Sequence, residues 1–319
     1  MTYSFDPELA AWVSLLSEAD FSEIARVRQV EAQLTGLAPR ERAAAVDIRD
    51  LTVPATEEGP GVGVRIYSPA GRRGGLPGLL YMHGGGFAIG SVDTFHVETS
   101  HIAAEVGAVV ASVEYRLAPE HPFPAALDDC YAVLKWMVAN SDALGVDPER
   151  IGVAGESAGA GLAAGLALYA RDRGGPALVM QYLGTPVVDD RLDTLSMRAF
   201  TDTPGWNRHN AELSWDYYLG GRGRRGGDDT SPYAAPARAE DLSGLPPAYV
   251  TACEFDPLRD EDLGYARRLI SAGVPAEVHH FPGTFHGSAQ LAPHAGVSRR
   301  MIAELLDALR RGLRAADGE

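Results

Sequence analysis

A serine between two glycines is the feature of this sequence whose residue types and spacing most directly indicate chemistry. Residues 155–159 read GESAG, with Ser157 at the centre. Glycines two residues before and after a serine let neighbouring backbone come close to a sharp turn, which lifts the hydroxyl clear of the chain. The helix expected after Ser157 favours the negative charge that develops in acyl transfer. The alternative is an ordinary strand-to-helix turn in which the serine is an N-cap.

A run of three glycines lies upstream of that serine. Residues 83–86 read HGGG and follow an expected strand at residues 78–82. Consecutive glycines let the backbone expose N–H groups, which suits an oxyanion hole completed by the N–H of Ala158. Taken alone, the run could equally be a flexible turn. It is not a dinucleotide or phosphate fingerprint, because neither G-x-G-x-x-G at a first βα turn nor G-K-[ST] is present.

The base is expected to be His286. A serine hydroxyl is a poor nucleophile unless a base accepts its proton. His286 follows a late expected strand, in PGTFHGS, where the chain order serine, acid, histidine places the base of such a strand-turn-helix nucleophile. His83 would shape the glycine run, and His279 and His280 lie inside an expected strand. A lone histidine can also be a surface or packing residue.

The acid that orients the histidine is expected just after the preceding strand, at residues 247–252. Asp256 lies there, and the proline that follows it favours a fixed extended turn. Its carboxylate would hold the imidazole tautomer and stabilise the imidazolium. Asp260 is the second candidate, with a supporting role expected. Either carboxylate could instead stand at a helix N-terminus.

Alternating strands and helices must position these residues. Periodicity predicts strands at residues 62–67, 78–82, 108–114, 151–154, 178–183, 247–252 and 276–281. It predicts helices at residues 124–140, 158–171, 258–272 and 297–314. This alternation is typical of an α/β fold with a mostly parallel central sheet flanked by helices on both faces.

Two stretches interrupt the alternation. Residues 1–50 are expected to be helical and to precede every strand. Residues 189–229 include Trp206, Trp215, Tyr217 and Tyr218, followed by a GGRGRRGGDD loop. We interpret both as a helical cap over the carboxyl edge of the sheet, although both could simply decorate the core. The expected organisation is a cap segment at 1–50, a core at 51–188, a cap insertion at 189–229 and the rest of the core at 230–319.

Composition excludes several classes of protein. The chain of 319 residues carries a formal net charge of -15, which disfavours nucleic acid as a partner. Cys130 and Cys253 are too few for a disulfide framework and lack metal-ligand spacing, so we expect free thiols in a reducing compartment.

The N-terminal region also bears on location. It has acidic residues before any dense apolar run, unlike a secretory signal. The apolar residues 151–170 contain Glu156 and several glycines, which fits a strand-turn-helix better than a membrane span. We therefore expect a soluble cytoplasmic protein without stable membrane insertion.

A set of longer motifs identifies a family. They are HGGGF at 83–87, EYRLAPEHPFPAALDD at 114–129, GESAG at 155–159, DPLRDE at 256–261 and HG at 286–287. In this order the sequence resembles the bacterial hormone-sensitive-lipase-like esterases of the α/β-hydrolase superfamily. The run at 114–129 is the most specific of the five.

The resemblance implies an α/β-hydrolase core with a helical cap, and cofactor-free hydrolysis of carboxylic esters with short-to-medium acyl chains. It implies a small-molecule ester as partner, no metal, and a possible homodimer. Carried over by motif, the triad is Ser157, Asp256 and His286, and the oxyanion N–H groups belong to Gly84, Gly85 and Ala158.

Two residues depart from the family pattern. Glu156 stands where many members have aspartate, and Ser288 stands where phenylalanine often follows the glycine after the histidine.

Two other functions are possible for this sequence. An amidase or acyltransferase could use the same residues, because the motif handles acyl groups generally. A catalytically inactive binding protein is the other rival, since plant hormone receptors resemble this family. Those receptors replace the triad histidine, whereas His286 is present here.

Overall fold

An eight-stranded sheet forms the centre of the molecule. A computed structural model describes residues 3–14, 19–37, 45–55, 59–71 and 74–314. Strands β3 to β8 are parallel, whereas β1 and β2 join one edge antiparallel, so the expected mostly parallel sheet is confirmed. The strand order is β1-β2-β4-β3-β5-β6-β7-β8. The strands are β1 (Val46–Val53), β2 (Val62–Pro69), β3 (Leu76–Met82), β4 (Val109–Glu114), β5 (Val146–Glu156), β6 (Gln181–Gly184), β7 (Ala248–Phe255) and β8 (Ala276–Phe285).

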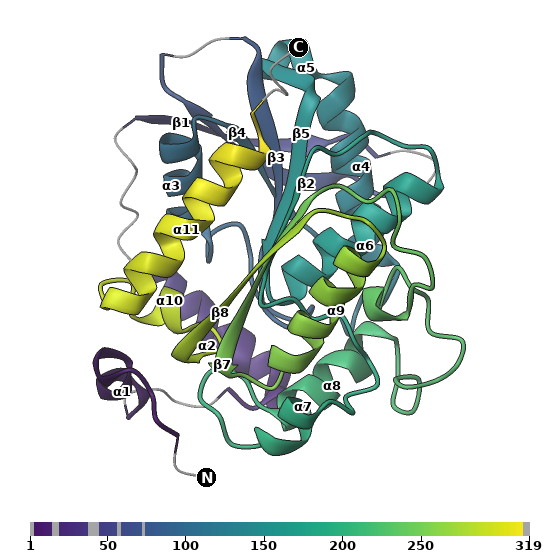
Figure 1. The fold of residues 1–319 in the computed structure, drawn as a ribbon. Helices are drawn as coiled ribbons and strands as arrows, with labels where there is room; N and C mark the ends of the chain where they lie inside the picture. The colour runs from purple at the N-terminus through teal and green to yellow at the C-terminus, as the bar shows by residue number, and fades with distance from the viewer. Residues whose placement is uncertain (1–2, 15–18, 38–44, 56–58, 72–73, 315–319) are drawn as a thin grey trace.

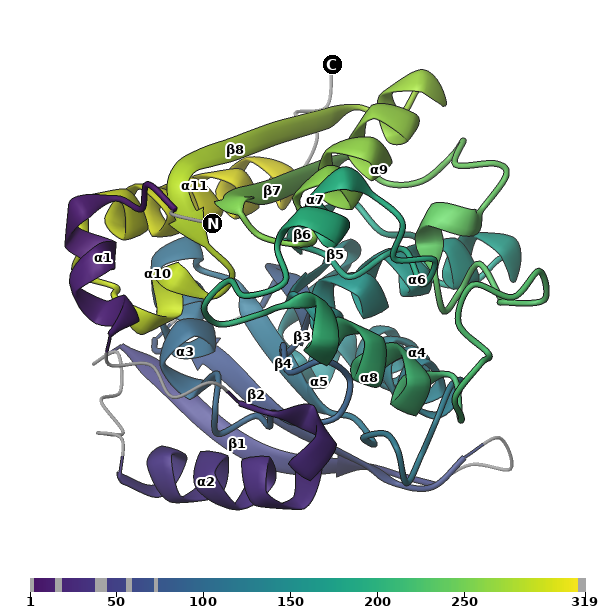
Figure 2. The same cartoon turned by 90° about the horizontal axis from the view of Figure 1, so that it is seen from below.

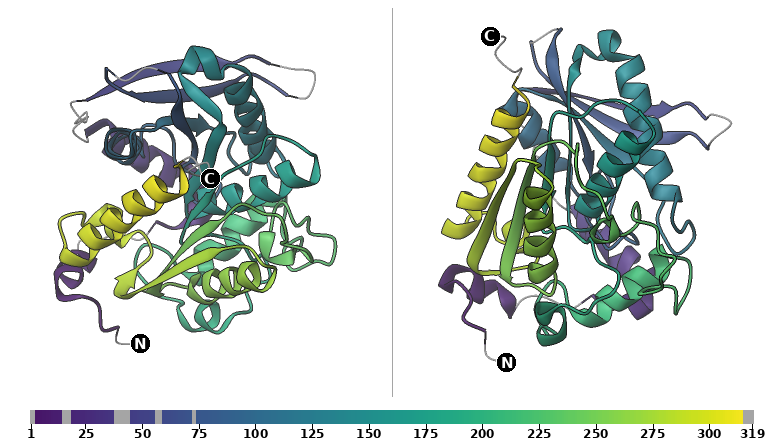
Figure 3. Two further views of the ribbon diagram at one scale, coloured as in Figure 1. Left: turned by 45° about the horizontal axis from the view of Figure 1, so that its top comes forward. Right: turned by 45° about the vertical axis from the view of Figure 1, so that its right-hand side comes forward.

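Helices cover both faces of the sheet, as Figures 1 and 3 show. Helices α3 (His96–Val106) and α11 (Gly296–Gly312) pack on one face. Helices α4 (Ala125–Ala139), α6 (Ala158–Asp172) and α9 (Arg259–Ser271) pack on the other. Because both faces are covered, β3 and β4 are buried along almost their whole length. The short helices α5 (Ser141–Leu144) and η2 (Pro236–Arg238) lie in connections.

The apolar stretch at residues 151–170 is the end of β5 followed by α6, as the sequence predicted. From Ala158 to Ala170 every residue of α6 is buried, and most of them are alanine or glycine. Small side chains let this helix lie close to the sheet. No helix in the described ranges is both long enough and apolar enough to cross a membrane.

The remaining helices gather at the carboxyl ends of the parallel strands (Figure 2). They are α1 (Pro7–Val13), η1 (Phe21–Glu23), α2 (Ile24–Leu37), α7 (Leu195–Ala199), α8 (Arg208–Tyr218) and α10 (Ser288–Leu291). The N-terminal segment and α8 are bonded to each other: the Phe21 N–H donates to Asn210 Oδ1 at 3.0 Å, and the Tyr217 hydroxyl donates to the Phe21 carbonyl at 2.7 Å. Helix α8 also reaches the glycine run, because Ser214 Oγ donates to the Gly86 carbonyl at 2.8 Å.

Several elements differ from the sequence expectation: β5 and β8 are longer than predicted, α5 and α10 were not predicted, and β1 and α3 were missed. Strand β1 begins at Val46, inside the segment 1–50 that we expected to be helical throughout. Its alternation of exposed and half-buried residues breaks at Arg49 and Asp50, which are adjacent, polar and exposed, so the period of two is too short to predict a strand. Helix α3 was not predicted, because its buried positions include Thr99 and Ser100 as well as apolar residues. Residues 38–44, between α2 and β1, lie outside the described residues.

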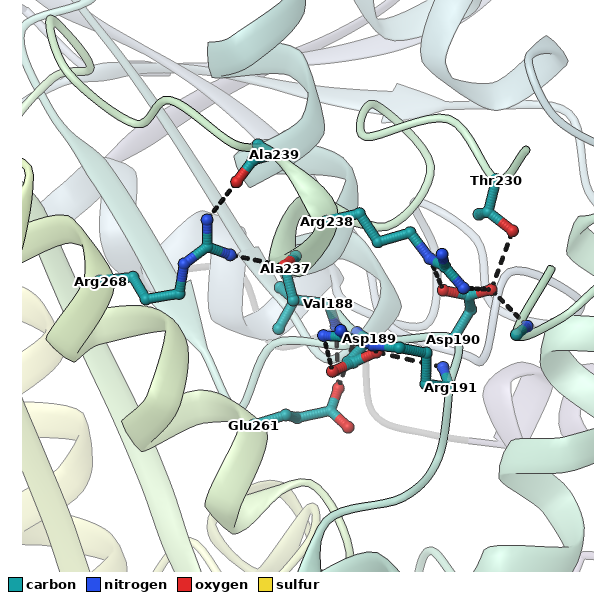
Figure 4. A network of polar contacts seen from close by, with 11 residues as sticks. Val188, Asp189, Asp190, Arg191, Thr230, Ala237, Arg238, Ala239, Glu261 and Arg268 are labelled. Atoms are coloured by element: carbon teal, nitrogen blue, oxygen red, sulfur yellow. Dashed lines mark hydrogen bonds and ion pairs between the residues drawn. The ribbon is translucent and has the colours of Figure 1, made fainter. Parts of the chain in front are cut away.

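Buried ion pairs fix the base of the 189–229 segment to the core (Figure 4). The Asp190 carboxylate is fully buried and accepts hydrogen bonds from Arg238, from Thr230 Oγ1 at 3.0 Å and from the Gly226 N–H at 2.7 Å. Glu261 of α9 accepts from the N–H groups of Val188 at 2.9 Å and Asp189 at 3.2 Å. A buried carboxylate is costly unless it is paired, so these contacts define how the segment leaves and rejoins the sheet.

Candidate active site

Ser157 occupies the turn between β5 and α6. Its backbone has φ 56° and ψ -119°, a left-handed conformation that is rare and strained for a residue with a side chain. The Ser157 N–H donates to the Gly184 carbonyl at 2.8 Å, which holds the turn in place. A Cβ atom at Gly155 would collide with the backbone of Gly159, so the two glycines of the motif are required by close packing. The structure therefore supplies the sharp turn that the motif predicted.

Replacing Gly159 with alanine is expected to destabilise the protein. The added Cβ would collide with the carbonyl oxygens of Met82 and His83, which belong to the backbone and cannot rotate away. We expect Gly159→Ala to lower the free energy of unfolding in urea by about 3 kcal/mol, the upper end for overpacking. Gly264→Ala is the matched control, because a Cβ there meets nothing within 4 Å and Gly264 lies inside α9. It should be neutral or stabilising by about 0.5–1 kcal/mol. Equal effects in the two variants would contradict the packing explanation.

The structure brings the three candidate side chains into one hydrogen-bonded chain. Ser157 Oγ lies 2.9 Å from His286 Nε2, and His286 Nδ1 lies 2.7 Å from Asp256 Oδ2. A carboxylate can only accept, so Nδ1 carries the proton and Nε2 is left to accept from the serine hydroxyl. Asp256 is fully buried, and its other oxygen accepts from the Leu258 N–H at 2.9 Å. His286 and Asp256 follow directly on β8 and β7, at the same edge of the sheet as Ser157.

The other acid and base candidates lie elsewhere. Asp260 accepts from the Ser196 N–H at 2.8 Å and pairs with Arg259, so it holds α7 and not the imidazole. His279 pairs with Glu304 of α11 at 2.5 Å. His209 is paired with Asp20 at 3.4 Å on the surface. Of the acid candidates that the sequence left open, the structure places Asp256 beside His286.

The glycine run forms a loop beside the nucleophile. Gly85 has φ 125° and Gly86 has φ 56°, conformations that favour glycine. Gly84 packs on Ser157 so closely that a Cβ there would lie 3.5 Å from Ser157 Cβ. No hydrogen bond of the described residues uses the N–H of Gly84, Gly85 or Ala158, and the N–H groups of a helix's first turn have no acceptor within the helix. These three donors are thus available to an oxyanion next to Ser157.

His83 supports this loop from beneath. It is fully buried, stacks on the Tyr115 ring with centroids 4.1 Å apart, and donates from Nδ1 to the Gly84 carbonyl at 2.8 Å. The Tyr115 hydroxyl donates to the His83 carbonyl at 2.8 Å. Downstream, Arg116 forms a bidentate ion pair with the buried Asp129. The long 114–129 motif therefore has a structural task, which is to hold the backbone of the glycine run.

Burial of His83 makes stability depend on pH. Desolvation lowers its pKa from 6.5 to about 4, since Nε2 has no partner among the described residues. The unfolded chain then binds the proton more readily, so this contribution is present above about pH 6.5 and is lost as the pH falls toward about 4. Between about pH 7 and pH 4.5 we expect the free energy of unfolding of the wild type to fall by about 2–3 kcal/mol more than that of His83→Asn. Parallel pH curves for the two proteins would contradict the assignment.

Aromatic side chains from the N-terminal segment and from the 189–229 segment lie next to the triad. Trp206 packs edge-on against Phe21 with ring centroids 5.2 Å apart and lies 5.9 Å from the His286 ring. Both aromatic residues also touch the glycine run, because a Cβ at Gly86 would meet Phe21 and Trp206 at 2.8 Å. Trp206 is one of the aromatic residues that distinguish the 189–229 segment in the sequence. Phe21 was not predicted to lie at the site, because its position shows only when the N-terminal segment is folded over the sheet.

The described residues contain neither a candidate metal site nor an activated cysteine. Within the described ranges no group of three or more His, Cys, Asp or Glu side chains is placed so that it could hold a metal ion. Cys130 and Cys253 are free, buried thiols, as expected. Burial raises the pKa of both thiols well above the ordinary value, so neither is an activated nucleophile.

Comparison with known proteins gives a consistent result. Residues 79–290 match a family described as "alpha/beta hydrolase fold". The chain is 40% identical over 252 residues to carboxylesterase NlhH of Mycobacterium tuberculosis, covering 79% of each protein. It is 32% identical over 295 residues to ethyl acetate hydrolase of Pseudomonas putida, covering 89% of this chain and 91% of that one. Among solved structures, a bacterial heroin esterase is similar with a TM-score of 0.94 and 48% identity, covering 98% of this chain and 99% of the other.

Proposed function

This chain belongs to the α/β-hydrolase family, in its hormone-sensitive-lipase-like branch, and is a carboxylesterase; we propose that it cleaves short-to-medium acyl esters through a Ser157 acyl-enzyme. The observation that carries the proposal is the hydrogen-bonded chain from Ser157 Oγ to His286 Nε2 at 2.9 Å, and from His286 Nδ1 to Asp256 at 2.7 Å. A serine paired with a base that is itself oriented by a third group is the arrangement of an activated nucleophile.

The proposed reaction has two halves. Ser157 Oγ attacks the ester carbonyl while its proton passes to His286 Nε2, and the N–H groups of Gly84, Gly85 and Ala158 hold the oxyanion. His286 then gives this proton to the leaving alcohol oxygen, and the acyl group stays on Ser157. Water attacks the acyl-enzyme, with His286 taking its proton and returning it to Ser157 Oγ as the carboxylic acid leaves.

The preference for short-to-medium chains is supported by the aromatic wall. Phe21 and Trp206 are 2% and 5% exposed. The Trp206 ring lies 5.9 Å from the His286 ring and packs against Phe21, so the two aromatic residues limit the room beside the triad. A rigid, well-packed wall rejects an extra methylene by about 1–3 kcal/mol. Long acyl chains are then poor substrates unless the wall moves.

A series of p-nitrophenyl esters from acetate to palmitate tests the proposal. We expect the highest kcat/KM on short and medium chains with a steep fall thereafter. Trp206→Ala should shift the optimum toward longer chains, because it removes the larger part of the wall. Trp12→Ala is the matched control, since Trp12 is 44% exposed on α1. A wild-type optimum at palmitate would overturn the chain-length proposal. Hydrolysis of none of the esters would overturn the substrate class.

A further inference from the structure

A cleft enters the molecule next to the triad, but none of the three triad residues lines it. This cleft, of about 330 Å³, runs between α3, α10 and α11 and ends at the carboxyl ends of β5, β6 and β7. Its outer walls include the exposed residues Val97 and Pro293, and its inner end is formed by Glu156 and Thr185. Glu156 is the chain neighbour of Ser157, so the cleft reaches the back of the nucleophile turn. Figure 1 shows α3, α10 and α11 on one side of the sheet.

The carboxyl groups of Glu98 and Glu156 both line this cleft, and the charge of Glu98 acts on Glu156. Glu98 of α3 accepts from the Tyr81 hydroxyl at 2.6 Å and from Gln290 Nε2 at 3.4 Å. Glu156 is packed against Gly184 and has no hydrogen bond with any described residue. Burial raises the pKa of both groups, and the charge of Glu98 raises that of Glu156 further. Both side chains are half-buried, and a partly desolvated carboxyl group without a hydrogen-bond partner has a cost in free energy that a cation would offset.

Much of the remaining lining is apolar or aromatic, and it also includes the polar side chains of Thr94, His101, Thr185, Thr251, Cys253 and Gln290. Phe95 and Tyr182 bring aromatic rings to the walls, and Met301 and Leu305 bring flexible and aliphatic surface from α11. Ser288 lines the cleft and is 1% exposed, and its Oγ has no partner among the described residues. The cleft therefore offers a ligand aromatic and apolar contacts beside its two carboxyl groups.

These features select one kind of cation. A hard metal ion such as calcium takes about six to eight oxygen ligands in a defined arrangement. Among the described residues, no group of three or more His, Cys, Asp or Glu side chains is placed to hold a metal ion. An organic ammonium ion instead combines contact with aromatic faces, neutralisation by carboxylates and alkyl groups against apolar walls. A volume of about 330 Å³ suits a small molecule. We propose that this cleft binds a small organic ammonium ion, whose charge lies between the carboxylates of Glu98 and Glu156.

The site has a characteristic pH dependence. The ammonium ion needs both carboxyl groups ionised, whereas burial favours their protonated forms in the empty cleft. Binding therefore releases protons, and affinity rises as the pH increases through the raised pKa values. A cation attracted only by the negative surface of the protein would show no such proton release.

The test compares choline with its neutral isostere, 3,3-dimethylbutan-1-ol. Isothermal titration of the intact chain at about pH 8 should give one choline site, with affinity higher than that for the alcohol by about tenfold or more. Glu98→Gln and Glu156→Gln should each weaken choline binding by a similar factor. Glu105→Gln is the matched control: it removes one charge from the same helix, but Glu105 is half exposed and pairs with Arg310 at 3.1 Å.

Three results would overturn the proposal: no choline binding, equal binding of the neutral alcohol, or the same loss in Glu105→Gln as in the two cleft variants. Thermal unfolding of each variant identifies one that fails to fold, and the other cleft variant then decides. The binding readout does not depend on esterase turnover, so it remains valid if the proposed function fails.

A second comparison identifies the source of the ammonium group. If it belongs to the ester that is cleaved, acetylcholine should have a lower KM than 3,3-dimethylbutyl acetate, and Glu98→Gln should remove the difference. If it belongs to a separate ligand, the two KM values should agree while choline still binds.

Discussion

Ser157→Ala is expected to abolish ester hydrolysis, with kcat falling by about 10⁶-fold, as when a serine nucleophile is removed from a working triad. The reason is geometric: no other hydroxyl in the described ranges is hydrogen-bonded to His286 Nε2, so the variant has no atom to carry the acyl group. Removing this small hydroxyl should leave the fold intact. The measurement is turnover of a p-nitrophenyl ester, with the unfolding midpoint recorded beside it.

Ser271→Ala is the matched control for that variant. Its hydroxyl donates to the Arg267 carbonyl of its own helix at 2.9 Å and lies on the surface, so turnover should stay at the wild-type level. A phosphonate ester gives a second readout, because it should add its mass to the wild type and not to Ser157→Ala. Wild-type turnover in Ser157→Ala would sink the acyl-enzyme mechanism altogether.

Asp256→Asn should lower kcat by about 10⁴-fold while leaving KM nearly unchanged. Asp256 is fully buried and touches His286 Nδ1 at 2.7 Å, so its carboxylate fixes which ring nitrogen carries the proton. An asparagine amide can donate to Nδ1 instead, and Nε2 would then carry the proton and could not accept one from Ser157. KM should stay unchanged because Asp256 is buried and contacts Nδ1, on the side of the imidazole ring away from Ser157.

Asp260→Asn separates the two acid candidates. Its carboxylate caps α7 through the Ser196 N–H and pairs with Arg259, away from the imidazole. We expect its kcat to stay at the wild-type order of magnitude, with any cost appearing in stability. If Asp260→Asn lost as much activity as Asp256→Asn, the assignment of the acid would be wrong.

The amino-acid sequence alone was sufficient to predict the strands and helices with strong local patterns. Helix α6 was predicted from residue 158 to 171 and runs from Ala158 to Asp172, because small apolar residues directly follow the GESAG turn. Strand β4 and helix α9 were likewise found within one residue at each end. Elements with weak patterns were not predicted. In β1 the alternation breaks at the adjacent exposed residues Arg49 and Asp50, and α3 buries hydroxyl side chains, so neither carries a clear apolar period.

The sequence also indicated Ser157, Asp256 and His286, because each lies in a family motif that directly follows an expected strand. From the residues it ranked Asp256 ahead of Asp260, because a proline follows Asp256, but both follow the same strand and the sequence does not show which carboxylate reaches His286. That choice depends on where β7 and β8 end relative to each other, which is a property of the sheet register. Only the folded chain shows that His286 reaches Asp256.

Contacts between distant segments were decided by tertiary structure alone. Phe21 reaches Trp206 and the glycine run only because the N-terminal segment folds over the sheet. Glu98 and Glu156 come together across α3 and β5, and no local pattern links a helix residue to a nucleophile motif so far along the chain. Local propensity and motif spacing depend on residues that are close in the sequence. Cavities and buried charges depend on the packing of elements that are far apart in the sequence.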